Sequence, residues 1–407
     1  MNIFLLTTIY PSKFSPRGTT PVVHYFAVEW ARMGHNVHVF HTETLYPRLF
    51  FFIGKVFESY LNSLLGFIVP TRIPAEYDEI RDGVKITHMC LKKNRPHGRF
   101  TNAQLNYALE RIASVVEKEG GADSFIGHWD NPQLELLYML KCKYDKPTCL
   151  VFHDNVFTSL SKKYGNDLKC LIDSLDIIGF RNETAKNNYE ILFGKAPSTF
   201  IAASGVSRPF IEAGINDNKT FTGIHNFIYV GMLIERKFPV AVSNAIQKVF
   251  ESEPFKIVYV GDGEEKRNVE RSFRKAKSHG KLLFTGRISR ESVISYLKES
   301  DVFVMISKGE IFGLVYLEAM ALGCITIASR HEGLDGIIED GVNGFLCEAG
   351  NTDELEAIIR RIRSMRSSEL ELMSNNAKIT ARYYSDAKVA ERYIHNIEML
   401  CKDTVTE

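Results

Sequence analysis

Two carboxylates, Glu310 and Glu318, stand on either side of "IFGLVYL", a mostly apolar stretch with one glycine. Residues 301–307 are typical of a buried strand, "KGEIFG" of a loop, and "LVYLEAMAL" of a helix that begins near Gly313. A helix start exposes unpaired N–H groups and the positive end of the helix dipole, so it favours an anion such as phosphate. Gly313 would let this backbone approach a phosphate closely.

Glu318 lies inside the predicted helix, too far in to cap its start, and its neighbours are mostly apolar. A carboxylate there needs a partner, and the vicinal hydroxyls of a ribose can both donate to it. Glu310 precedes the helix start and would lie near the group that a diphosphate carries. We therefore expect a nucleotide-sugar site; the alternative is that both carboxylates are solvated surface charges.

The surrounding sequence alternates short apolar runs with longer helical patterns, which predicts doubly wound parallel α/β structure. A chain of 407 residues predicts two domains. We place the first at 1–205 and the second at 206–385, and expect a helix over 386–407 to pack back on the first. The predicted strands are 2–8, 36–42, 83–89, 123–129, 147–153, 176–181 and 198–204, then 226–231, 255–261, 281–286, 301–307, 324–329 and 344–348. Ligands of such sheets bind beyond the carboxyl ends of the strands.

Composition narrows the class of protein. A formal net charge of +1 gives no ground for a polyanionic partner such as nucleic acid. The seven cysteines form no CxxC pair, which argues against a disulfide framework and a zinc site and favours the reducing cytoplasm. The start "MNIFLLTTIYPS" lacks a basic region and is interpreted as a strand rather than a signal peptide, and no apolar run is long enough to span a membrane.

Several motifs together resemble the retaining glycosyltransferases of family 4. The signature of that family is Glu, seven residues and Glu, followed by Ala-Met-Ala and Gly, as in residues 310–323. "RMGHNVHVF", "IAASGVSRPF" and "EDGVNGFL" resemble three further family segments in the same order. The resemblance implies the GT-B fold, with two Rossmann-like domains facing across a cleft. It also implies that Glu318 holds the ribose, Glu310 the donor sugar, and the backbone of Phe312, Gly313 and Leu314 the sugar and diphosphate.

A second anion-binding element is expected in "YVGMLIERKFP". The family has Arg directly after the glycine and Lys five positions later; here these positions are Met232 and Lys237. Lys237 is assigned to the diphosphate, and Arg236 is a candidate to replace the missing Arg. For both cations the alternative is a solvated turn.

Two further turns are assigned to the donor. Gly261, in "VYVGDGEEK", is placed near the nucleotide, although the run lacks the third glycine of a Rossmann fingerprint. "FTGRISRE", with Arg287, follows the next strand, where the family places backbone contacts to the base.

The first half supplies the remaining candidates. Gly18 keeps one glycine of a family pair near the phosphates and acceptor, and Thr19 follows it. The resemblance gives His128, at a strand end, contact with the transferred sugar. His153 and Asp154, at the next strand end, are assigned to the acceptor cleft, with a purely structural role as the alternative.

No DxD occurs where a metal-dependent transferase requires one, and no His/Cys cluster has ligand spacing, so a metal-independent reaction is expected. For a retaining reaction the resemblance implies attack on the front face of the sugar. The leaving phosphate oxygen would help to remove the acceptor proton, Lys237 would stabilise the diphosphate, and no side chain acts as nucleophile. No cofactor is expected.

The acceptor is expected to be a saccharide. Residues 46–74 are apolar and aromatic, with basic residues along them, and could meet lipid headgroups at the inner face of the plasma membrane, as a lipid-linked acceptor would require. A buried helical pair or an oligomer contact is the alternative. The preferred hypothesis is a hexosyltransferase of surface (capsular) polysaccharide synthesis. A GT-B phosphorylase, a nucleotide-sugar epimerase and a non-catalytic nucleotide-sugar-binding subunit are the alternatives.

Overall fold

The fold was analysed on a computed structural model, which describes residues 1–14, 21–56, 72–93, 98–153, 157–196, 198–215, 217–276, 279–334 and 336–403. The chain divides into two compact units. The N-terminal unit contains Met1–Ala203 together with Val389–Glu407, and the C-terminal unit contains Ser204–Lys388.

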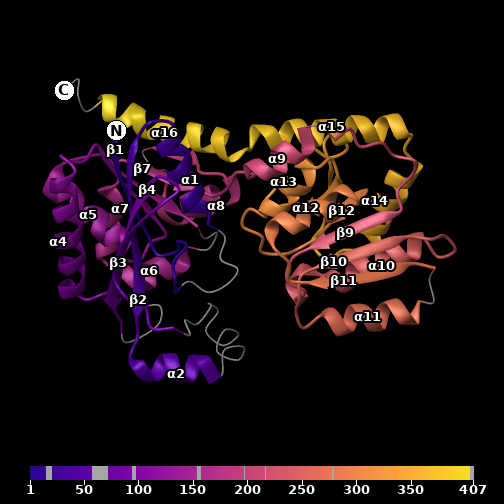
Figure 1. Ribbon diagram of the computed structural model, residues 1–407, viewed down its shortest axis with the longest axis horizontal. Helices are drawn as coiled ribbons and strands as arrows, with labels where there is room; N and C mark the ends of the chain where they lie inside the picture. The colour runs from indigo at the N-terminus through magenta and orange to yellow at the C-terminus, as the bar shows by residue number, and fades with distance from the viewer. Residues whose placement is uncertain are drawn as a thin grey trace. The chain divides into compact units, whose positions relative to one another are not determined.

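The N-terminal unit is built on an eight-stranded sheet with the order β3-β4-β2-β1-β5-β6-β7-β8 (Figure 1). Its strands are β1 (Asn2–Thr7), β2 (Asn36–Leu45), β3 (Tyr77–Arg81), β4 (Val84–Lys92), β5 (Ser124–His128), β6 (Thr148–Phe152), β7 (Ile177–Phe180) and β8 (Thr199–Ile201). Its helices are α1 (Val22–Arg32), α2 (Arg48–Val56), α4 (Asn102–Lys118), α5 (Gln133–Tyr144), α6 (Thr158–Tyr164), α7 (Asp167–Asp173), α8 (Glu183–Phe193) and most of α16 (Asp386–Asp403).

The C-terminal unit is built on a six-stranded sheet with the order β11-β10-β9-β12-β13-β14. Its strands, all parallel to their neighbours, are β9 (Asn226–Val230), β10 (Lys256–Val260), β11 (Lys281–Gly286), β12 (Val302–Val304), β13 (Ile325–Ser329) and β14 (Phe345–Cys347). Its helices are α9 (Arg208–Ile215), η1 (Glu235–Lys237), α10 (Pro239–Val249), α11 (Lys266–Lys275), α12 (Arg290–Lys298), α13 (Leu314–Ala321), α14 (Thr352–Ser364) and α15 (Ser367–Tyr383).

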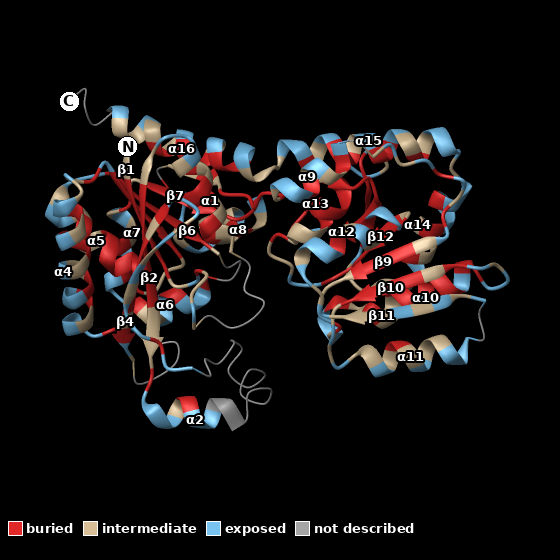
Figure 2. Ribbon diagram, in the orientation of Figure 1, coloured by how far each residue is buried: buried red, intermediate tan, exposed pale blue. Residues whose placement is uncertain are grey.

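Helices cover both faces of each sheet, so the central strands are buried on both sides. Figure 2 shows these strands in red, beneath helices that expose one pale blue face. Every residue of β5, β6 and β13 is buried. This burial explains why the strands are near-continuous apolar runs rather than alternating ones. The prediction of two Rossmann-like α/β halves is confirmed; that they face each other across a cleft stays a prediction.

The first sheet has one antiparallel edge strand that was not among the predicted strands. Strand β3 pairs antiparallel with β4, with Arg81 opposite Val84. Asp82 and Gly83 between them both have positive φ, 51° and 82°. Two such residues close a two-residue hairpin whose twist matches that of the strands, and Asp-Gly is a favoured pair for it. The sequence "RDGV" carried this signal, and the sequence analysis did not use it.

The end of the chain belongs to the first unit. Helix α16 lies against α1, where the Trp30 indole N–H donates to the backbone oxygen of Ala390 at 3.0 Å. The aromatic ring of Tyr393 also packs edge-on against Trp30, with ring centroids 5.0 Å apart. The units meet in sequence at Ala203 and Ser204 and again at Lys388 and Val389, where the sequence analysis placed the boundaries at 205 and 385.

The Gly214→Ala substitution should destabilise the C-terminal unit by about 1–3 kcal/mol. A Cβ on Gly214, in α9, would lie 1.9 Å from the backbone oxygen of Ala321 at the end of α13. One of these two helices must therefore move. Denaturant unfolding monitored by circular dichroism measures the change. Glu212→Ala, at an exposed position of the same helix, is the control, and equal stability of the two variants would contradict this packing.

Candidate functional site

The proposed diphosphate element is the turn from β12 into α13. Gly313 is the residue before the helix, and no side chain caps the helix start. Its φ of 70° is left-handed, and a Cβ there would lie 2.5 Å from the Tyr316 ring. Glycine is thus required by the local backbone itself. The prediction that the helix begins at this residue is confirmed, and Phe312 and Leu314 flank the turn.

Glu310 and Lys237 form an ion pair at the start of this turn. The Lys237 Nζ lies 3.0 Å from the Glu310 Oε2, and only 11% and 18% of the two side chains is exposed. The hydroxyl of Ser307 donates to the same carboxylate oxygen at 3.3 Å. The structure thus brings together two residues that lie 73 positions apart in sequence and that were assigned to the same donor.

Glu332 and Gly333 hold the loop of Glu310 in place, and the sequence analysis did not identify them. The backbone N–H of Glu310 donates to the Glu332 Oε2 at 2.8 Å. Gly333 packs so closely that a Cβ on it would lie 2.7 Å from backbone atoms of Phe312. The run "HEG" after β13 was the available signal, since loops after parallel strands gather at one edge of the sheet.

Glu318 is buried, with 5% exposure, and its partner is Arg290. The Arg290 Nε donates to the Glu318 Oε1 at 2.5 Å, and the Arg290 Nη2 contacts the same oxygen. Burial raises the pKa of Glu318, and the Arg290 guanidinium opposes that rise. The expectation that this carboxylate needs a partner is confirmed, but an arginine in "FTGRISRE" meets the need in this structure. Arg287, the arginine assigned from that run, is exposed.

Arg236 contacts backbone oxygens in this structure, and its role as a substitute for the absent arginine stays a prediction. Its Nη1 donates to the backbone oxygens of Lys308 at 3.1 Å and Gly309 at 3.4 Å. Met232, at the position where the family has arginine, is 46% exposed. Arg236 therefore supports the loop that carries Glu310.

Gly261 is explained by packing between two turns. Its φ is 134°, and a Cβ would lie 2.0 Å from the backbone oxygen of Gly231, the glycine that follows β9. The backbone N–H of Gly261 donates to the oxygen of Gly286 at 2.9 Å. A ligand is not needed to account for this glycine, so its contact with the nucleotide stays a proposal.

His128 is fully buried at the end of β5 in the N-terminal unit. Its Nδ1 lies 2.8 Å from the Nε2 of His153, and its Nε2 lies 3.3 Å from the hydroxyl of Tyr393. Trp129, which sequence analysis did not single out, stacks on His153 with ring centroids 3.8 Å apart. His128 thus presents no surface to a sugar in this conformation, because both ring nitrogens are engaged.

Burial lowers the pKa of His128 to about 3, with a further lowering by the Arg181 charge. An unfolded histidine has a pKa near 6.5, so below that pH the unfolded chain binds a proton that the folded chain refuses. The free energy of unfolding should therefore decrease as the pH is lowered below 6.5, by about 1.4 kcal/mol per pH unit for each such histidine. Denaturant unfolding of His128→Gln between pH 6 and 4 should show a slope shallower by that amount. His279→Gln, at an exposed position, is the control, and an unchanged slope in His128→Gln would contradict the assignment.

A cavity of about 670 Å³ opens at the carboxyl ends of the N-terminal strands. Its size is in the range of small-molecule sites. It is lined by Thr8, Thr44, Tyr46, Lys93, Trp129, Asp130, Asn131, Phe152, Phe157, Ser159, Leu160, Lys162 and Lys163. Lys163 Nζ pairs with Asp130 at 2.6 Å, and burial followed by the nearby Lys163 charge lowers the pKa of Lys93 to about 8. The lining therefore combines aromatic rings with several cations.

Three predicted site residues, Gly18, Thr19 and Asp154, lie outside the described residues. Within the described ranges, one group of His, Cys, Asp and Glu side chains has ligand atoms close enough for a metal ion: His41, Glu43 and His88. It contains none of the residues predicted for the donor or acceptor. No helix of the described chain has the length and hydropathy needed to cross a bilayer.

The chain is similar in sequence to known glycosyltransferases. Residues 213–380 match the family described as glycosyl transferases group 1. An uncharacterized glycosyltransferase of Methanocaldococcus jannaschii is 27% identical over 66% of this chain and 73% of its own length. The N-acetyl-alpha-D-glucosaminyl L-malate synthase of Bacillus anthracis is 35% identical, over 35% of each chain.

The fold is also shared with solved structures. The crystal structure of Anabaena HepE in complex with UDP has a TM-score of 0.66 and 14% identity, over 98% of this chain and 100% of that one. A likeness at this identity shows the fold, which is GT-B.

Proposed function

We propose that this chain, whose residues 213–380 match the family of group 1 glycosyl transferases, is a retaining hexosyltransferase that uses a nucleotide-diphosphate sugar. One observation carries the proposal: the Lys237–Glu310 ion pair lies at the uncapped start of α13, and Glu318 lies further along the same helix. This arrangement supports a diphosphate at the helix start, a ribose near Glu318 and the donor sugar near Glu310.

In the proposed reaction the bond from the anomeric carbon to the diphosphate oxygen breaks, and the acceptor oxygen bonds to the same face of that carbon. The departing phosphate oxygen takes the acceptor proton. Lys237 and the helix start stabilise the charge that develops on the diphosphate, without a divalent metal. Glu310, released from Lys237 by the incoming phosphate, would orient the sugar and support positive charge at its anomeric carbon. His128 would act as a positioning residue, through His153 beneath Trp129.

The acceptor is proposed to bind in the cavity at the carboxyl ends of the N-terminal strands. An aromatic ring such as Trp129 suits the apolar face of a sugar, and the cluster of Lys93, Lys162 and Lys163 suits an anionic group. A saccharide carried on a lipid phosphate has both features. The name of the Bacillus anthracis relative includes L-malate, which is also an anion.

We propose that helix α2 contacts the inner face of the plasma membrane. Such contact would suit an enzyme of surface polysaccharide synthesis. Leu49, Phe52 and Ile53 of this helix are exposed, by 66%, 68% and 37%. Exposed apolar side chains on one short helix suit insertion among lipid headgroups. Residues 57–71, which belong to the segment 46–74 predicted to contact lipid, lie outside the described residues.

The decisive experiment screens nucleotide sugars for stabilisation of the protein, and then follows the best donor with anionic saccharide acceptors by NMR. We expect release of nucleoside diphosphate and a product whose anomeric configuration matches that of the donor. Inversion of configuration would refute the retaining assignment.

The alternatives give other outcomes in the same assay. An epimerase interconverts two nucleotide sugars without release, and a phosphorylase requires inorganic phosphate. Met232 favours a third candidate, a non-catalytic binding subunit, because it leaves the diphosphate with one cation fewer than the family pattern has. That candidate predicts donor binding without turnover on any acceptor.

A further inference from the structure

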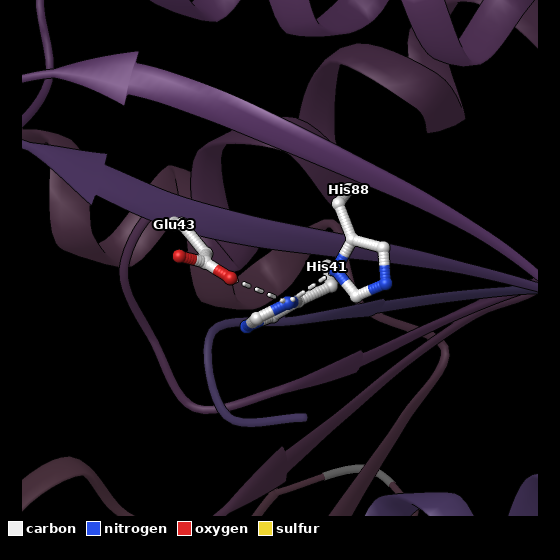
Figure 3. A group of neighbouring side chains, drawn as sticks. All are labelled: His41, Glu43 and His88. Atoms are coloured by element: carbon white, nitrogen blue, oxygen red, sulfur yellow. Dashed lines mark hydrogen bonds and ion pairs between the residues drawn. The ribbon is translucent and has the colours of Figure 1, made fainter. Parts of the chain in front are cut away.

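The side chains of His41, Glu43 and His88 converge on one face of the N-terminal sheet. His41 and Glu43 are alternate residues of β2, and His41 is paired with His88 on the neighbouring strand β4. Figure 3 shows the imidazole of His41 between the other two side chains. The Nδ1 atoms of the two histidines lie 2.9 Å apart, and the Glu43 Oε1 lies 3.6 Å from the Nδ1 of His41.

The orientation of the His88 ring directs the lone pair of its Nδ1 toward His41. Its Nε2 lies 3.2 Å from the Oε1 of Glu79, on β3, and a carboxylate fixes the proton of a neutral imidazole on the nitrogen that faces it. The Nδ1 of His88 is then an acceptor that faces the Nδ1 of His41. The Glu43 Oε1 is buried and has no hydrogen-bond partner. The His41 Nδ1 thus faces two acceptors, the His88 Nδ1 and the Glu43 Oε1, which either a proton on His41 or a bound cation would satisfy.

Both imidazoles are buried, and burial disfavours their charged form. Neutral imidazoles are the form that binds metals, and one cation could be held by the two rings and the Glu43 carboxylate together.

We propose that His41, Glu43 and His88 bind one divalent transition-metal cation, of which Zn²⁺ is the representative. Two imidazoles and one carboxylate are a ligand set that zinc accepts, whereas Ca²⁺ and Mg²⁺ prefer oxygen ligands alone. Bonds of 2.0–2.1 Å in a tetrahedron place neighbouring ligand atoms about 3.3 Å apart. The observed separations of 2.9 and 3.6 Å lie on either side of that value.

The groups around the cluster also suit a metal site. Glu79 would act as the outer carboxylate that orients a metal-bound histidine, as is usual for such ligands. The side chains of His41 and His88 are 3% and 1% exposed, and that of Glu43 is 14% exposed, so Glu43 lies on the side from which an ion can enter. Metal binding would cross-link side chains of the paired strands β2 and β4, next to the edge strand β3.

The test uses the untagged full chain, stripped with a chelator and titrated with Co²⁺ and then Zn²⁺. We expect visible d–d absorption that saturates at one Co²⁺ per chain, displacement of this absorption by Zn²⁺, and a Zn²⁺-dependent rise in Tm. Glu43→Gln and His88→Gln should each weaken binding at least tenfold. Glu79→Gln should weaken it about 10- to 100-fold while leaving all three ligands in place.

His38→Gln is the matched control. His38 is a buried histidine of the same strand, but its ring bonds Glu119 at 2.8 Å and Thr87 at 3.0 Å, away from the cluster. It should bind Co²⁺ as the wild type does. The proposal is overturned if the wild type takes up no metal, which would mean that the two rings merely share a proton. It is equally overturned if folded Glu43→Gln or Glu79→Gln retains the wild-type affinity.

Discussion

Replacing Lys237 with methionine is expected to lower kcat by about 100- to 1000-fold, with a much smaller effect on donor Kd. Lys237 is the cation that pairs with Glu310 ahead of α13, with its Nζ 3.0 Å from the carboxylate. Charge develops on the diphosphate as the sugar leaves, so the loss of this cation penalises the transition state more than the bound donor. Steady-state kinetics and calorimetry with the same donor separate the two effects.

The same substitution leaves the half-buried Glu310 without its cation, so stability should fall as well. Adding Glu310→Gln should restore much of that stability, because the unpaired charge is then removed. It should not restore kcat. Lys308→Met, at an exposed lysine of the same loop, is the control for charge alone. Full turnover in Lys237→Met, or recovery of kcat in the double variant, would contradict a catalytic role.

The Glu318→Ala substitution is expected to weaken donor binding by about 1–3 kcal/mol, roughly 5- to 150-fold, because hydrogen bonds from the ribose to a charged group are lost. In the structure Arg290 contacts the Oε1 of this carboxylate. The ribose must therefore share the carboxylate with Arg290 or displace it. Calorimetry with the best nucleoside diphosphate measures the loss.

A ligand lacking the 2′-hydroxyl tests whether Glu318 itself contacts the ribose. Wild-type protein should prefer the ribonucleoside diphosphate over its 2′-deoxy form, and Glu318→Ala should lose that preference. Arg290→Ala should retain it, because Glu318 stays in place. Equal discrimination by Glu318→Ala and the wild type would show that the carboxylate serves only to hold Arg290.

The elements that position the site could be predicted because their signals are local. Each predicted strand is a strand of the structure, since parallel strands buried on both faces are continuous apolar runs. The helix after Gly313 was also predictable from local sequence, and so was the need of the Glu318 carboxylate, among apolar neighbours, for a polar partner. Lys237 was assigned to the diphosphate through a family resemblance, and its proximity to Glu310 follows from the order of β9 and β12 in the sheet.

The partners that the sequence did not reveal depend on strand register or on loops that meet in space. Arg287 and Arg290 both lie in "FTGRISRE", and the sequence does not indicate that Arg290 is the one that contacts Glu318 of α13. The His41–His88 contact requires β2 and β4 to be neighbours in a known register, although 47 positions separate the two residues. Spacing along a chain cannot report such a pairing.

Because α16 packs on the first unit, the N-terminal unit can finish folding only after the whole chain has been synthesised. Because Val389–Glu407 belong with Met1–Ala203, the first half leaves the ribosome with Trp30 and its neighbours still uncovered. The N-terminal unit lacks its last helix, α16, until the second half has been synthesised. A gene cut between the halves would therefore produce an unfinished first fragment, unless the final segment were supplied in trans.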